Sequence, residues 1–195
     1  MSNNQTSRSE SDSDHWLKQY YFIRAAFSVL WVAAAFTLGR QSFAVAAALL
    51  IIYPAWDAAA NAVDAARSGG FAANRSQAIN VIASSIMTLA VILALTISMN
   101  WVLAAFGLWA IFSGLLQLSA ALRRWKTTGG QWAMILSGAQ SAAAGALFIF
   151  QAQMPQEPSI STVAGYAGVG AFYFLVSATW LSIALSRRRL RGAEL

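Results

Sequence analysis

The chain has 195 residues and a formal net charge of +6; 58% of the residues are hydrophobic, only 10% are charged, and the mean hydropathy is +0.54. An ordinary soluble domain has about 25% charged residues, so this composition excludes a water-soluble protein and predicts one whose solvent is the bilayer. Cysteine is absent and the one histidine, His15, lies in a polar segment, so disulfides and cysteine metal sites are excluded and we expect no metal and no cofactor.

The chain divides into a polar start, a long hydrophobic region and a short end. Residues 1–15 are rich in Ser and Asn without apolar periodicity, which predicts a disordered tail. Residues 16–191 hold six hydrophobic segments of about 20 residues, the length that a spanning helix needs. These segments are 20–39, 43–64, 79–99, 101–122, 132–151 and 163–186. With 192–195 as a short C-terminal tail, the prediction is an all-α membrane protein of six transmembrane helices.

The basic residues predict the orientation. With six spans, every Lys and Arg except Arg40 falls on one side, which by the positive-inside rule is cytoplasmic and holds both termini. On the opposite side, the first two connections are the short stretches 39–42 and 99–100. We therefore expect the helices to form three hairpins in sequence. Because the charges flank hydrophobic segments, we expect contact with the bilayer and no nucleic-acid partner. The cluster 187–191 is expected to bind anionic lipid headgroups.

The second, fourth and sixth segments carry matched positions. The closing arginines are Arg67, Arg123 and Arg187. Fourteen positions before them lie the aromatic residues Tyr53, Trp109 and Tyr173. Ten positions before them lie the polar residues Asp57, Ser113 and Ser177, and six before them lie Asn61, Gln117 and Leu181. We favour internal duplication, so that the hairpins are pseudo-repeats, over the alternative that any such helix ends in Arg and carries an aromatic residue.

The deepest polar residues are predicted in the segment 53–67. On a helix, Pro54, Asp57, Asn61 and Asp64 share one face because they are three or four residues apart. Asp57 lies roughly 21 Å along the helix from Phe43, inside an apolar slab about 30 Å thick. An acid at that depth needs a partner or a water-filled cavity.

Arg24 is the natural partner of Asp57. It precedes Arg40 by sixteen residues and Asp57 follows Arg40 by seventeen, so across a tight turn the two lie at the same depth. One interpretation is an ion pair that fixes the register of the first two helices. A second is that Asp57 titrates in a cavity with Asn61. A third is that Arg24 extends to the headgroups while Asp57 meets water alone.

The other polar residues argue against an enzyme. Asp64 is expected at a solvated helix end, where it could pair with Arg67. An intramembrane aspartyl protease or a phosphatidyl-alcohol transferase needs carboxylates from a second helix, and the segment 79–99 has none. Gln117 and Gln140 lie within spans, where they either bond across helices or line a pore.

Small residues predict close helix packing in the fifth segment, where Gly138 and Ala142, and Ser141 and Gly145, are four residues apart. Gly165, Gly168 and Gly170 predict either the same packing or a loosened start of the sixth helix. A solute groove is the alternative for these small residues.

The stretch from Gly107 to Gly138, with GLWAIFSG, LLQLSAALRRW and QWAMILSG, resembles the short-repeat membrane proteins typified by HdeD. The recurring glycines of that family are kept at Gly107 and Gly114 and become alanine at 171 and 178. The resemblance implies a bacterial inner-membrane protein of six helices with a role in acid or stress tolerance and no established reaction. It leaves Asp57 unexplained.

Two functions are therefore expected. The first is a non-catalytic, multi-pass inner-membrane protein of this type, acting in acid or envelope stress through packing, lipid contact or partner binding, with homo-oligomerisation left open. The second is a small transporter or channel for protons or a polar solute, which would use Asp57, Asn61, Gln117 and Gln140. The segments 43–52 and 101–111 are almost wholly apolar, so a water path is expected to be sealed on the outer side.

Overall fold

The computed structural model describes residues 2–124 and 131–193, and almost all of this part of the chain is helical. The helices are α1 (Ser2–Ala34), which ends in the π-helical turn η1 (Ala35–Gly39), α2 (Phe43–Arg67), α3 (Arg75–Leu95), α4 (Met99–Arg124), α5 (Gln131–Ala152) and α6 (Ile160–Ala193). Local chemistry sets several ends. Ser42 caps α2 by accepting from the Val45 amide, and α2 stops where Gly69 and Gly70 adopt positive φ angles of 91° and 87°.

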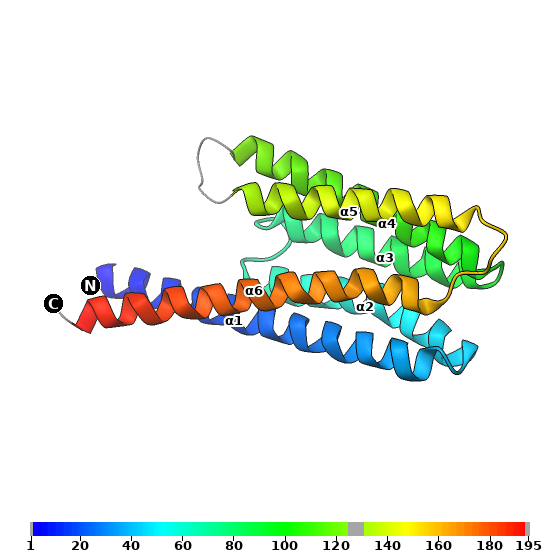
Figure 1. Cartoon of the computed structure of the whole chain (residues 1–195). Helices are drawn as coiled ribbons and strands as arrows, with labels where there is room; N and C mark the ends of the chain where they lie inside the picture. Colours follow the sequence, from blue (N-terminus) through cyan, green and yellow to red (C-terminus); the bar gives the residue numbers. More distant parts are fainter. Residues whose placement is uncertain (1, 125–130, 194–195) are drawn as a thin grey trace.

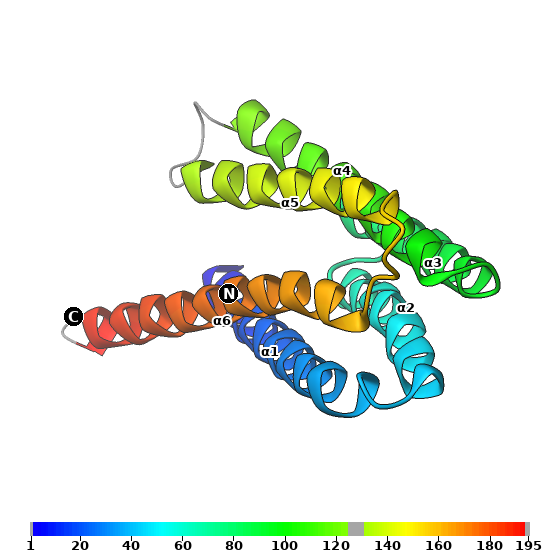
Figure 2. The ribbon, with the colours of Figure 1, turned by 45° about the vertical axis from the view of Figure 1, so that its right-hand side comes forward.

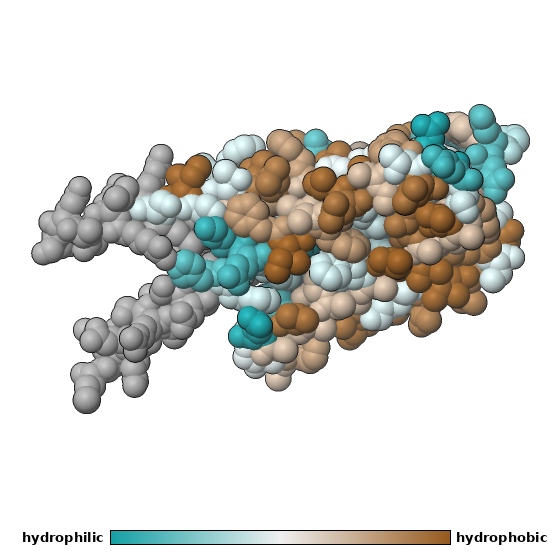
Figure 3. All heavy atoms as spheres, turned by 90° about the horizontal axis from the view of Figure 1, so that it is seen from below, coloured by the Kyte–Doolittle hydropathy of each residue, from teal (hydrophilic) through white to brown (hydrophobic). Residues whose placement is uncertain are grey.

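Within the described residues, six helices are long and apolar enough to cross a membrane, as the sequence predicts. Their spanning segments are His15–Gly39, Phe43–Arg67, Arg75–Leu95, Met99–Ser119, Ile135–Ala152 and Ile160–Trp180. Both chain ends lie at the same end of the bundle (Figure 1). Hydrophobic residues dominate the flank shown in Figure 3, and hydrophilic ones gather towards its two ends. The chain is a multi-pass membrane protein.

The predicted disordered tail is helical in the structure, because α1 begins at Ser2. The prediction relied on the absence of apolar periodicity in residues 1–15. Extending a helix that already exists costs much less than nucleating one, so the spanning part of α1 can carry a polar extension. The side chains of residues 2–14 and of the basic cluster 187–191 lie outside the described set.

The helices form two layers, one of α1, α2 and α6 and the other of α3, α4 and α5 (Figures 1 and 2). We call the end with the connection 68–74 the open end. The closed end carries the turns 40–42, 96–98 and 153–159. The layers lie apart between α5 and α6, and α2 and α3 pack against each other where the layers join.

The closest helix pairs are not the predicted hairpins. The chain turns tightly between α1 and α2 and between α3 and α4, but the most extensive packing joins α4 to α5, α2 to α3 and α6 to α1. Each even-numbered helix thus packs mainly on the helix that follows it, and α6 packs on the first helix. A short turn fixes which ends are neighbours and leaves the facing surfaces to side-chain fit.

Glycines explain why α4 and α5 pack most closely. A Cβ atom added to Gly145 would lie 2.5 Å from the Gly107 carbonyl oxygen, and one added to Gly107 would lie 2.9 Å from that of Gly145. Gly114 and Gly138 face each other in the same way about two turns further along. The predicted close packing through small residues of α5 is confirmed. By contrast, Gly165 and Gly168 have nothing within 4 Å of an added Cβ, so they do not serve close packing.

The apolar core fills the closed-end half of the bundle. It contains the fully buried side chains of Leu50, Val91, Leu103, Phe106 and Val163, which come from α2, α3, α4 and α6. Trp31 of α1 and Phe148 of α5 complete it. The apolar segments 43–52 and 101–111 contribute Leu50, Val102, Leu103 and Phe106 to this core.

Glycine substitutions should separate the two kinds of glycine. Gly145→Ala places a methyl group against the backbone of α4, including the Ile111 nitrogen at 2.7 Å, so we expect it to destabilise the protein by about 1–3 kcal/mol. Gly165→Ala enters open space and gains up to about 1 kcal/mol of helix propensity, so its unfolding temperature should stay the same or rise. Thermal unfolding in detergent measures both; a similar loss in the two variants would contradict the packing described here.

Candidate functional site

A cavity of about 1240 Å³ lies between the two layers, and residues of all six helices line it. The predicted residues Arg24, Asp57, Asn61, Asp64, Gln117 and Gln140 are all among them. So are the aromatic and polar matched positions of the proposed repeat whose side chains are described: Tyr53, Trp109, Tyr173, Asp57, Ser113, Ser177, Asn61 and Gln117. The three even-numbered helices therefore present equivalent positions to one space, which is what an internal duplication would produce.

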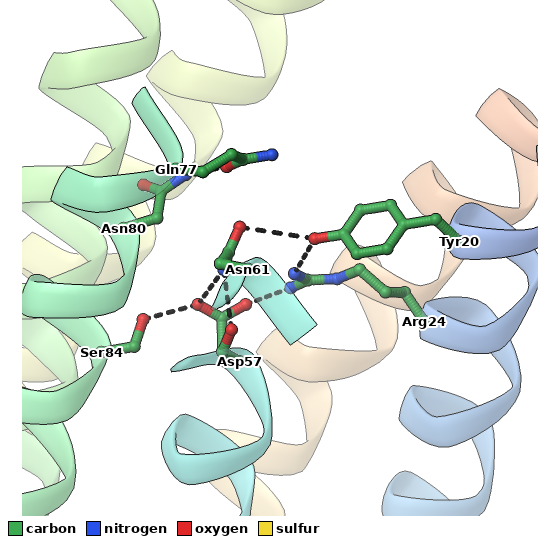
Figure 4. Close-up of polar contacts among 7 residues, drawn as sticks. All are labelled: Tyr20, Arg24, Asp57, Asn61, Gln77, Asn80 and Ser84. Atoms are coloured by element: carbon green, nitrogen blue, oxygen red, sulfur yellow. Dashed lines mark hydrogen bonds and ion pairs between the residues drawn. The ribbon is translucent and has the colours of Figure 1, made fainter. Parts of the chain in front are cut away.

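Asp57 is the centre of the polar network (Figure 4). One of its carboxylate oxygens accepts from Arg24, in the ion pair expected from matched depth. The other accepts from the Ser84 hydroxyl at 2.5 Å and from the Asn61 amide at 3.0 Å. The side chains of Arg24 and Asp57 are only 12% and 16% exposed. Stranding either charge costs about 2.5–3.5 kcal/mol even on the most permissive insertion scale, so the pair stabilises the contact of α1 with α2 and α3.

Arg24 is held from several sides. It donates to the Tyr20 hydroxyl at 2.9 Å, and Tyr20 also reaches the Asn61 side-chain oxygen at 3.4 Å. The guanidinium carbon lies 4.4 Å from the centre of the Phe174 ring on α6. Arg24 therefore points inward to Asp57 and does not extend to the headgroups, which excludes the third interpretation for this state.

Asp64 differs from its predicted place at a solvated end. It is only 5% exposed and accepts from the Trp16 indole at 3.0 Å and from the Gln77 amide. Arg67 does not pair with it; its guanidinium carbon lies 4.1 Å from the centre of the Trp16 ring. The prediction was wrong because α1 extends beyond the apolar segment and places Trp16 over this part of α2.

Two tyrosines of α6 bridge the cavity to α5. The Tyr173 hydroxyl donates to Gln140, and the Tyr166 hydroxyl lies 2.8 Å from that of Ser141. Gln140 therefore bonds to α6 and, among the described residues, not to Gln117 of α4. Gln117 lines the cavity with its side chain exposed.

Sequence reasoning missed Trp16, Tyr20, Gln77, Ser84 and Tyr166 as members of the polar network. Trp16 and Tyr20 lie before and at the start of the first apolar segment, and nothing in the sequence indicates a partner for the indole or the hydroxyl group. Ser84 is a single small polar residue in an apolar helix. Only the packing of α2 on α3 identifies it as a donor to Asp57.

Fold and cavity together define a six-helix integral membrane protein with a polar cavity between two helix layers. Residues 81–150, which run from α3 to α5, match the family described as a short repeat of unknown function (DUF308). This stretch contains the facing glycines of α4 and α5. No curated protein and no solved structure matches the chain.

The Arg24–Asp57 contact can be tested with a double-mutant cycle. Asp57→Asn and Arg24→Gln each leave one buried charge without its partner, so each should destabilise the protein by about 2–4 kcal/mol. The double variant removes both charges and should cost less than the sum, with a coupling free energy of about 1–3 kcal/mol.

Unfolding in detergent measures all four proteins. Arg40→Gln, an exposed arginine at the closed end, is the control and should add independently to Asp57→Asn. Additive effects of Arg24→Gln and Asp57→Asn would mean that the contact does not form in the bilayer protein.

Proposed function

We propose that the protein is a non-catalytic membrane protein that takes up a small polar or amphipathic solute from one face of the bilayer. The observation that carries this proposal is the cavity between the two layers, whose charged residues Arg24, Asp57 and Asp64 lie towards the open end and whose lining along α5 and α6 reaches Gln151 and Thr162. Polar groups placed within a bilayer are costly, and they commonly mark a binding site or a pathway. A purely structural role would be served by an apolar interior.

The absence of catalysis is part of the same proposal. Both carboxylate oxygens of Asp57 are engaged by Arg24, Ser84 and Asn61, and both of Asp64 are engaged by Trp16 and Gln77. Carboxylates occupied in this way serve to hold helices and shape a cavity. They are poorly placed for general acid or base chemistry, which needs a carboxyl group within reach of a substrate.

The cellular setting rests on the resemblance to HdeD-type proteins. This resemblance supports a location in the bacterial inner membrane, with both termini and the open end in the cytoplasm. It also supports a role in acid or envelope stress. The basic cluster 187–191 would then contact anionic lipid headgroups.

The second candidate is a carrier that works by alternating access. The two-layer arrangement favours it, because two helix layers that enclose a cavity and join mainly through α2 and α3 can move relative to each other, as such a carrier requires. An open channel is disfavoured by the apolar side chains, among them Leu147 and Phe148, that line the cavity towards the closed end.

Cysteine scanning tests the cavity directly, because the chain has no native cysteine. Gln117→Cys should react with a membrane-impermeant thiol reagent in inside-out vesicles and not in right-side-out vesicles, since it lines the cavity. Glu157→Cys, at the exposed closed-end turn, should show the opposite pattern. Val102→Cys, fully buried in the core, should react in neither. Labelling of Gln117→Cys from the same side as Glu157→Cys would refute the proposed access.

Proton conduction is expected to be absent. Because apolar side chains such as Leu147 and Phe148 line the part of the cavity towards the closed end, liposomes that contain the purified protein should lose an imposed pH gradient no faster than empty liposomes. Fluorescence of an internal pH dye measures the rate. A leak that Asp57→Asn abolishes would contradict this expectation and favour a proton pathway.

A further inference from the structure

We propose that the ligand of the cavity is a hydrophobic organic cation, which enters from the lipid between α5 and α6. This inference rests on the proposed function, in that it names the class of solute that the cavity takes up. Three independent features carry it: the charge of the cavity wall, its aromatic side chains and its opening towards the bilayer.

Among the residues that the structure describes, the charged ones of the wall are Arg24, Asp57 and Asp64, which is one cation against two carboxylates. Arg24 neutralises Asp57. The partners of Asp64 are the indole of Trp16 and the amide of Gln77, both of which are neutral. A buried carboxylate whose hydrogen-bond partners are neutral has no counter-charge among them, so this part of the wall favours a cation over an anion.

Aromatic rings of the wall suit a cation that carries apolar groups. Tyr53 and Trp109 contact each other edge to face with ring centres 6.3 Å apart, and both line the cavity. The wall already holds one organic cation in this manner, because the Arg24 guanidinium lies over the Phe174 ring. Rings within about 6 Å stabilise ammonium-type ligands, and the gain is largest away from water.

The cavity extends sideways between α5 and α6. Its lining there includes Ala143 and Ala144, whose side chains are small, and Gly165, which has no side chain. Nothing lies within 4 Å of a Cβ atom added to Gly165, so there is space at this position. Leu147 and Val169, which also line it, are about half exposed on the flank of the bundle, at 52% and 47%. A solute dissolved in the bilayer can therefore reach the space past the two tyrosine bridges without crossing the apolar core.

Size and polarity agree with such a ligand. Binding pockets for drug-sized molecules span roughly 300–1,000 Å³, and the cavity of about 1240 Å³ can hold one with some water. An apolar groove of about 470 Å³ between α3 and α4 shares Ile79, Ala83, Trp109 and Phe112 with the cavity. The apolar part of a ligand can extend into this groove while its charge stays near Asp64.

The probe for the test is tetraphenylphosphonium, a hydrophobic cation, and the full-length protein is used in nanodiscs. We expect saturable binding above that of protein-free nanodiscs. Gln117→Lys adds a positive charge to the cavity wall without touching the Asp57 or Asp64 hydrogen bonds, so it should weaken binding at least about tenfold. Gln117→Met, of similar length and uncharged, is the matched control and should keep the wild-type dissociation constant.

A second pair of variants tests the carboxylate. Asp64→Asn should weaken binding about tenfold, while Glu157→Gln, which removes an exposed charge at the closed end, should leave it unchanged. If Asp64→Asn disturbs folding through loss of a hydrogen bond, the comparison of Gln117→Lys with Gln117→Met tests the inference by itself. Absence of saturable binding, or binding that Gln117→Lys does not weaken, would overturn the inference. One-sided labelling of Gln117→Cys would in that case still support the proposed function with a different solute.

Discussion

The constraint on which the structure depends is the presence of a carboxylate, Asp57, within the apolar part of α2. A single charge there would oppose insertion, and it is compensated by groups from both neighbouring helices: Arg24 of α1 and Ser84 of α3. These two helices belong to different layers of the bundle. The same contacts that neutralise Asp57 therefore hold the layers in register where α2 meets α3, and they leave the rest of the space between the layers free to form a cavity.

Much of the fold could be predicted because membrane spans carry strong signals: length, hydropathy and the segregation of basic residues. The Arg24–Asp57 contact was also predictable, since a tight turn and a rise of 1.5 Å per residue determine relative depth. Packing partners were not. Nothing in the sequence near Asp64 indicates that Trp16 covers it, because that contact depends on how far α1 extends. Ser84 likewise becomes a partner only after α3 packs on α2, so the sequence predicts the charges and not the neutral donors around them.

The packing brings the matched positions of the even-numbered helices to one cavity. Tyr53, Trp109 and Tyr173 lie on different helices and face one cavity, and each of the three helices packs mainly on the helix that follows it, counting α1 as the successor of α6. Duplication of a two-helix unit, followed by divergence, accounts for both facts. At one of the matched polar positions α2 has the charged Asp57, whereas the other two helices have Ser113 and Ser177. The ion pair with Arg24 therefore distinguishes α2 from the other two even-numbered helices.

The pairing of α1 with α6 has a consequence for biosynthesis. Helices α4 and α5 can dock as soon as both have left the ribosome, because their facing glycines supply the contact within one stretch of chain. The main partner of α1 is α6, which is made after the other five helices, so Arg24 has no Phe174 ring to stack on until α6 has been synthesised. Closure of the bundle thus requires that all six helices are present.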